Sequence, residues 1–111
     1  MKGKITIGNK TITMNCDAAT PVWYTQVFHE DFFVTAEKFA QSETNGESVG
    51  IYSKIAFIAA NQAKTEDLSG LSFLDYTKWL SQFAAYDMAA AVDDIAELYS
   101  KQAEKTATPK K

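Results

Sequence analysis

The chain begins with a short alternating pattern and then changes to helical spacing for the rest of its length. Residues 3–13 read Gly-Lys-Ile-Thr-Ile-Gly-Asn-Lys-Thr-Ile-Thr, which is two alternating apolar and polar runs around Gly8-Asn9. This pattern is typical of a β-hairpin, because Gly accepts the positive φ that a two-residue type II′ turn requires. Two registers fit: the two-residue turn pairs Ile5 with Ile12, and a four-residue loop pairs Ile7 with Ile12. In both, one face is apolar, so the hairpin must pack on helices or pair its edge with another chain.

After Thr20 the apolar residues recur at three- and four-residue intervals, which indicates short amphipathic helices. The first helix is predicted to begin at Thr20-Pro21, with Thr as N-cap and Pro at the first helical position, and to end near Asp31. There follow a second apolar stripe at 32–40, a polar loop at 41–48, helices at 49–64 and 72–83, and a last helix that Asp87 caps and that reaches Tyr99. The predicted fold is mainly α within the α+β class, an N-terminal β-hairpin followed by a compact bundle of four to five short helices.

The length of 111 residues fits a single domain with one core. We assign that domain to residues 1–102 and expect residues 103–111, a polar tail that contains Lys, to be disordered. Residues 1–100 hold seven Lys and thirteen Asp or Glu, a net charge of −6, whereas residues 101–111 hold four Lys and one Glu, a net +3. All eleven basic residues are Lys. An acidic body without Arg argues against nucleic-acid recognition.

The composition also indicates a compartment. A single cysteine, Cys16, excludes an internal disulfide and a cysteine-based zinc site, and it fits a reducing cytosol. The N-terminus Met1-Lys2-Gly3-Lys4 leads directly into the alternating pattern, so no signal peptide is expected. No stretch approaches the ~18 consecutive apolar residues of a membrane span. We therefore expect a cytoplasmic protein that does not enter a membrane.

Few residues suggest covalent chemistry. His29-Glu30-Asp31 groups three polar residues, but neighbours on a helix point in different directions, so we interpret this run as a solvated helix end. Cys16 beside Asp17 lacks an evident base and is interpreted as a small, partly buried thiol. Asp93-Asp94 with Glu97 matches no EF-hand loop and is interpreted as the wet face of the last helix. We predict no catalytic residue, no cofactor and no metal site, and hence a protein that is not an enzyme.

The aromatic residues are harder to explain by a core alone. Six of them crowd into seventeen residues: Trp23, Tyr24, Phe28, Phe32, Phe33 and Phe39. Most are expected in the core, yet two short helices bury six rings with difficulty, and the adjacent Phe32 and Phe33 cannot both point inward. We therefore expect one or two rings on an exposed apolar patch, and such patches mark protein-binding surfaces.

The order of these patterns resembles a known family. The hairpin string Ile-x-Ile-Gly-Asn-Lys-x-Ile-x-Met is followed by Ala18-Ala19-Thr20-Pro21 and by an aromatic segment with Tyr24, Phe28 and Asp31. After a polar loop come the strings Ile55-Ala56-Phe57-Ile58-Ala59-Ala60, Phe73-Leu74-Asp75-Tyr76 and Trp79-Leu80. Over roughly residues 3–100, the chain is similar to the tail assembly chaperones of long-tailed bacteriophages that infect Gram-positive bacteria.

The resemblance implies a non-enzymatic function in the cytoplasm of the infected host and absence from the mature virion. Such chaperones coat the long, helical tape measure protein and hold it soluble until the tail tube protein polymerises around it. Many exist in two lengths, and the longer form arises by a programmed ribosomal frameshift near the end of the short gene. Pro109-Lys110-Lys111 suggests such a site, because a slippery run of adenines would encode Lys-Lys. The codons of the gene would test this hypothesis.

An aromatic groove could receive the apolar stripe of a partner helix, which is compatible with that role. We predict partner-binding residues in the aromatic segment and in the helix at 72–83: Trp23, Tyr24, Val27, Phe28, Phe32, Phe33, Tyr76 and Trp79. Self-association into rings or open filaments stays open, because the hairpin edge and the surplus rings could serve it. The alternatives are a structural head–tail connector or minor tail component of the virion, and a small host-directed regulator or adaptor.

Overall fold

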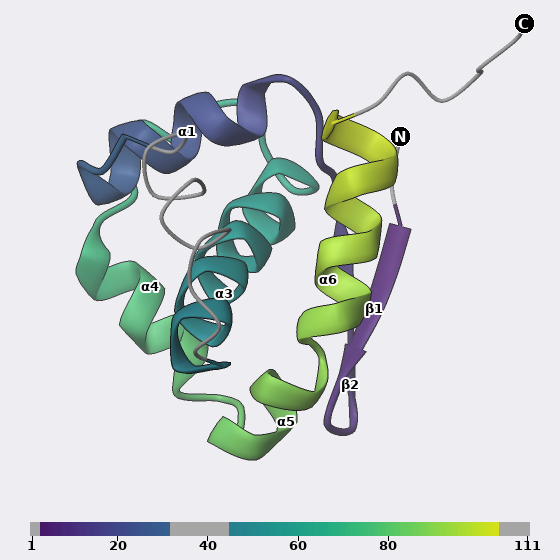
Figure 1. Ribbon diagram of the computed structural model, residues 1–111. Coiled ribbons are helices and arrows are strands. Elements are labelled where there is room, and N and C mark those ends of the chain that lie inside the picture. The colour runs from purple at the N-terminus through teal and green to yellow at the C-terminus, as the bar shows by residue number, and fades with distance from the viewer. Residues whose placement is uncertain (1–2, 32–44, 105–111) are drawn as a thin grey trace, which may run out of the picture.

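A computed structural model describes residues 3–31 and 45–104 (Figure 1). Strands β1 (Gly3–Ile7) and β2 (Lys10–Met14) form an antiparallel hairpin. Ile5 pairs with Ile12, which confirms the register of the two-residue turn and excludes the four-residue loop. Gly8 has a φ of 64°, as the first central position of a type II′ turn requires. The hairpin packs on the helices, because Ile5 and Ile7 are buried.

Helix α1 (Ala19–Phe28) begins two residues earlier than predicted and is capped differently. Thr20 is not the N-cap: Ala18 holds that position, and the Asp17 carboxylate accepts a hydrogen bond from the N–H of the first helical residue at 2.8 Å. The Thr20 side chain is buried, and its Oγ1 accepts from the Asp17 N–H and donates to Gln62 Oε1 at 2.6 Å. The Asp17 carboxylate thus serves the helix start, and Thr20 attaches α1 to Gln62 at the end of a helix far along the chain.

Helix α3 (Asn45–Gln62) starts four residues earlier than predicted, so residues 45–48 belong to this helix and not to a loop. Helix α4 (Phe73–Leu80) follows, and Ser72 and Asp75 form a reciprocal capping box at its start. The helix ends three residues before the predicted position. The apolar stripe predicted at 32–40 and the first half of the predicted loop lie outside the described residues.

The predicted last helix is two helices, α5 (Ala85–Ala90) and α6 (Val92–Tyr99), followed by a π-helical turn at Ser100–Glu104. Asp87 lies in the first turn of α5 and is not an N-cap. The helices separate at the buried Ala91, whose N–H is shared among carbonyl groups of the preceding turn. This break lets α5 contact the hairpin at one end while α6 runs along it (Figure 1). Residues 105–111 of the predicted tail lie outside the described residues, and residues 103 and 104 still belong to the helical turn.

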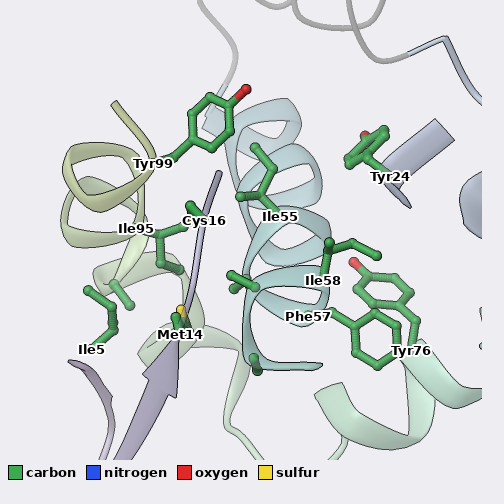
Figure 2. Packing of buried hydrophobic residues seen from close by; sticks show 14 of the residues in the cluster. Ile5, Met14, Cys16, Tyr24, Ile55, Phe57, Ile58, Tyr76, Ile95 and Tyr99 are labelled. Atoms are coloured by element: carbon green, nitrogen blue, oxygen red, sulfur yellow. The ribbon is translucent and has the colours of Figure 1, made fainter. Parts of the chain in front are cut away.

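Helix α3 lies at the centre of the molecule and contacts β2, α1, α4, α5 and α6 (Figure 1). Figure 2 shows that its two sides meet different side chains. We call the part between α3, α6 and the hairpin the aliphatic side of the core: Ile5, Ile7, Met14, Cys16, Ile95 and Tyr99. The part between α1, α3 and α4 is the aromatic side: Tyr24, Phe28, Phe57, Tyr76 and Trp79. The predicted class, mainly helical α+β with an N-terminal hairpin, is confirmed.

Candidate partner-binding surfaces

Four of the eight residues predicted to bind a partner lie in the core and not on the surface: Tyr24, Val27, Phe28 and Tyr76. The rings of Phe28 and Tyr76 pack edge to face at a centroid distance of 4.9 Å, and both contact the ring of Phe57 on α3. The expectation of exposed rings is therefore wrong for these positions. Three helices converge on Phe57, so the aromatic side buries more rings than two short helices would.

Two other predicted residues, Trp23 and Trp79, are half-buried and lie in different places. Trp23 borders a small hollow of about 160 Å³ beside Asp17 and Gln62. Trp79 packs on Phe57 and borders a larger hollow beside β2. The predicted residues Phe32 and Phe33 lie outside the described part of the chain.

The large apolar side chains that the structure does expose include Phe73 and Leu74 at the start of α4, at 57% and 60% exposure. The Phe73 ring touches the rings of Phe28 and Tyr76 only from the rim of the aromatic side. The adjacency of Phe73 and Leu74 could have indicated exposure, since two neighbours on a helix cannot both face the core. Val22 on α1 and Tyr86 on α5 are the other strongly exposed examples.

A groove opens between the start of α3, the end of α4 and α5. We call it the α4–α5 groove; its volume is about 300 Å³. Its main apolar walls are Val49, Leu80, Phe83 and Met88, and the small residues Ala84 and Ala85 form one rim. All but Met88 are at least partly exposed, so an apolar side chain from outside can reach these walls.

Ser53, which lines the floor of the α4–α5 groove, belongs to a satisfied polar pair. Ser53 Oγ donates to the Gly50 carbonyl oxygen at 3.1 Å and lies 2.7 Å from Tyr76 Oη, which therefore donates to Ser53. Burial raises the pKa of Tyr76, and Ser53 partly opposes that shift, because its hydroxyl can turn to donate to the ionised Tyr76 oxygen. Because the two hydroxyl groups satisfy each other, the floor makes no polar demand on a ligand.

A polar cluster covers the outer end of the aromatic side. Glu30 accepts hydrogen bonds from Tyr24 Oη at 3.1 Å and from Lys54 Nζ at 2.9 Å. Lys54 Nζ also lies 5.3 Å from the centroid of the Phe28 ring. Burial and the neighbouring Glu30 carboxylate raise the pKa of Tyr24. Glu30 is thus part of the packing and not of a solvated helix end, a role that neighbouring positions in the sequence do not reveal.

Of the residues considered for catalysis, His29 is exposed and Cys16 is buried. His29 is exposed where α1 ends, in a left-handed backbone conformation with a φ of 57°. Cys16 is buried, with 2% of its surface exposed. Burial raises the pKa of Cys16 to about 12, and the nearby Asp17 carboxylate adds to this shift. The thiol is therefore protonated at neutral pH, which makes it a poor nucleophile.

The acidic residues of α6 lie on its wet face as predicted, because Asp93, Asp94 and Glu97 are exposed. The pair between Lys101 Nζ and Glu97 at 3.2 Å is exposed as well. Within residues 3–31 and 45–104, no three His, Cys, Asp or Glu side chains are grouped so that they could hold a metal ion. In the same residues no helix combines the length and apolar character needed to cross a membrane.

Comparison with models of known protein families, with curated proteins and with solved structures finds no match for this chain.

Proposed function

We propose that this chain is a non-enzymatic tail assembly chaperone of a long-tailed bacteriophage, which binds the tape measure protein and keeps it soluble. The observation that carries the proposal is the open, apolar α4–α5 groove with its satisfied floor. A helix with an apolar stripe could insert a side chain between Leu80 and Phe83. The nature of the partner comes from the resemblance in residue order over roughly residues 3–100.

This contact surface replaces most of the one expected from the sequence. The rings of Tyr24, Phe28 and Tyr76 are buried, and the client would meet Leu80, Phe83 and the Ala84 rim instead. Burying one Leu or Phe side chain is worth roughly 1.5–3 kcal/mol before the costs of association are subtracted. A single groove therefore binds weakly, which suits a chaperone that must be displaced. Many copies along one long client would still lower the free concentration of the aggregation-prone form.

Charge supports the same kind of client. Residues 1–100 carry a net −6, so the body of the protein would attract a helix whose polar face is rich in Lys. In the proposed role the chain acts in the host cytoplasm, yields the client to the tail tube protein during polymerisation, and is absent from the mature virion. Mass spectrometry of purified particles separates this role from that of a head–tail connector or minor tail component, which would remain in the particle.

Co-expression with the tape measure protein tests the proposed surface. Ala84 lies on the rim of the groove and is exposed, so Ala84→Trp should block the groove without removing a core contact. We expect co-purification of the tape measure protein to fall at least about tenfold, the loss of a single apolar anchor. Ala90→Trp adds the same ring at an exposed position of α5 that does not border the groove, and it should leave co-purification unchanged.

Two results would count against the proposal. If the wild-type chain does not co-purify with the tape measure protein of the same phage, the client is wrong. If it does, but Ala84→Trp binds as well as Ala90→Trp while both keep a native circular dichroism spectrum, the client is right and the groove is wrong.

A further inference from the structure

The two outer edges of the hairpin differ, and the difference begins with the backbone. The pair that flanks a two-residue turn exchanges hydrogen bonds, and such pairs alternate along an antiparallel ladder with pairs that do not. Ile7 and Lys10 flank the turn, so the pairs Thr6–Thr11 and Lys4–Thr13 are of the second kind. The N–H and C=O groups of Thr11 and Thr13 therefore point away from β1. Within the described parts of the chain, no hydrogen bond to these backbone groups is formed.

Charged side chains border the free edge of β1. The hollow beside it is bordered by Lys4 and by three charged residues of the α6 region, Asp94, Glu97 and Lys101. Charged side chains along a free strand edge are a common means of preventing another strand from adding to it.

The free edge of β2 has a different border. A hollow of about 360 Å³ lies between Thr11–Thr13 and the neighbouring helices, and Ile12, Ala60, Ala63 and Trp79 line it. Its charged residue is Lys64, which is exposed and forms no ion pair with the described residues. Uncharged backbone groups, small alanine side chains and a flat ring together make room for one extended chain.

We propose that the hollow beside β2 binds an extended segment of a partner protein, which adds to the hairpin as a third strand. The segment would hydrogen-bond to the backbone of Thr11 and Thr13 and place an apolar side chain against Trp79. A carboxylate of the segment would pair with Lys64. A helix does not fit these requirements, because its own backbone groups are already bonded within it. The compact body of a second copy does not fit either, because α3 and α4 stand beside the edge.

This site is separate from the α4–α5 groove and does not rest on the proposed function. The groove uses Val49 and Ser53 near the start of α3, whereas the hollow uses Ala60 and Ala63 near its end. Both sites could be occupied at once. The chain would then hold a helical partner at one site and an extended partner at the other.

Titration of the isotope-labelled chain with the blocked peptide acetyl-Glu-Thr-Val-Thr-Val-Glu-amide tests the inference by nuclear magnetic resonance. We expect saturable shifts at the amides of Thr11 and Thr13 and at the indole of Trp79, with slower hydrogen exchange at both amides. A peptide N-methylated on alternate residues, which cannot form the strand pairing, should not bind. Lys64→Glu should weaken binding several-fold, and a peptide with Lys at both ends should reverse that preference.

A matched pair of variants tests the edge itself. Thr11 and Thr6 face each other, are both exposed, and both direct their N–H outward, Thr11 from β2 and Thr6 from β1. Thr11→Pro removes an outward donor without touching the ladder, and it should weaken the peptide about tenfold or more. Thr6→Pro makes the same change at the other edge and should leave the affinity unchanged.

The inference is wrong if the peptide shows no saturable binding at millimolar concentration, or if the N-methylated peptide binds equally well. It is also wrong if the amide chemical shifts centre on Thr6, or if both Pro variants lose peptide affinity equally. If sedimentation shows a dimer that Thr11→Pro dissociates, the edge is real but the occupant is a second copy, and the inference is wrong as stated. Should Thr11→Pro fail to fold, the Lys64→Glu variant and the N-methylated peptide still decide the question.

Discussion

The two sides of helix α3 are packed by different means. On the aliphatic side, mainly aliphatic side chains from the hairpin and α6 pack against one face of α3, and a Cβ added at Gly3 would lie 2.6 Å from Leu98 Cδ1. On the aromatic side, rings from three helices meet edge to face, and Lys54, Glu30 and Ser53 supply polar partners. The aromatic side continues through Trp79 to Phe83, and the Phe83 ring borders the α4–α5 groove.

The two sides of α3 differ in whether they serve stability or binding. The aliphatic side joins segments far apart in the chain, and it is closed by a hydrogen bond from the Cys16 N–H to Gln102 Oε1 at 2.9 Å. The aromatic side continues outward to the exposed Phe73 and to Trp79 and Phe83, whose rings lie 5.1 Å apart at the molecular surface. We therefore expect changes on the aliphatic side to alter folding alone, and changes at the rim of the aromatic side to alter binding first.

The largest expected effect is on the aliphatic side, from Ile95→Ala. Ile95 is almost fully buried at 1% exposure, and its truncation leaves a cavity between α6 and the hairpin. Such a change should lower the free energy of unfolding by about 2–5 kcal/mol, measured by urea denaturation followed by circular dichroism. The control is Glu97→Ala on the exposed face of α6, where loss of the surface pair with Lys101 should cost at most about 0.5 kcal/mol.

If Ile95→Ala lowered the free energy of unfolding no more than the control, the proposed difference between the two sides would be wrong. That result would mean that the aliphatic side is loosely packed and that the aromatic side alone holds the fold. It would also remove the reason for assigning stability and binding to different sides.

An intermediate effect is expected at the polar pair on the aromatic side. Ser53→Ala leaves the buried Tyr76 hydroxyl without its partner and should cost about 1–3 kcal/mol. Tyr76→Phe should cost less, about 0.5–1.5 kcal/mol, because Ser53 keeps its hydrogen bond to the Gly50 carbonyl. The double variant should cost less than the sum of the two, as a double-mutant cycle of unfolding free energies will show. Equal single costs that add would mean that the two hydroxyl groups do not interact.

Sequence reasoning reached the parts of the fold that local chemistry decides. The alternation around Gly8-Asn9 predicted the hairpin and left two registers open, and the structure has the register of the two-residue turn. Helical spacing located the helices to within a few residues. It failed where two local signals competed, since both Asp17 and Thr20 could cap α1. The break at Ala91 escaped because alanine neither starts nor ends a helix by preference.

The candidate surface was harder to predict, because exposure depends on what the rest of the fold places nearby. Tyr76 and Phe73 share a helix and an apolar character, yet Tyr76 is buried under α3 and Phe73 stands at the rim. Glu30 became a packing residue because Lys54 of α3 lies opposite it, a contact between residues far apart in the chain. The sequence indicated that the hairpin edge could pair with another chain, but it gave no sign of the hollow beside β2, since the walls of that hollow come from three elements.

The last expected effect is the dependence of stability on pH that Cys16 introduces on the aliphatic side. The pKa of Cys16 on the aliphatic side is raised from an ordinary value of 9.0 to about 12 in the folded protein, chiefly by burial. The unfolded chain therefore loses the thiol proton first as pH rises, and its deprotonation favours unfolding. The stability that Cys16 contributes is fully present below pH 9 and is lost progressively as the pH rises from there toward about 12. One pH unit above the ordinary value, the loss should be about 1.4 kcal/mol.

Comparison with Cys16→Ala isolates this contribution. The raised pKa of Tyr24 gives a loss of the same sign at higher pH, but Tyr24 is present in both proteins, so its contribution cancels in the difference. Denaturant curves at pH values between 8 and 10 give the unfolding free energies of wild type and Cys16→Ala. As the pH rises over this range, the unfolding free energy of the wild type should therefore fall relative to that of the variant. A constant difference would mean that the thiol is open to solvent in the folded state. The aliphatic side would then be no better sealed than the aromatic one.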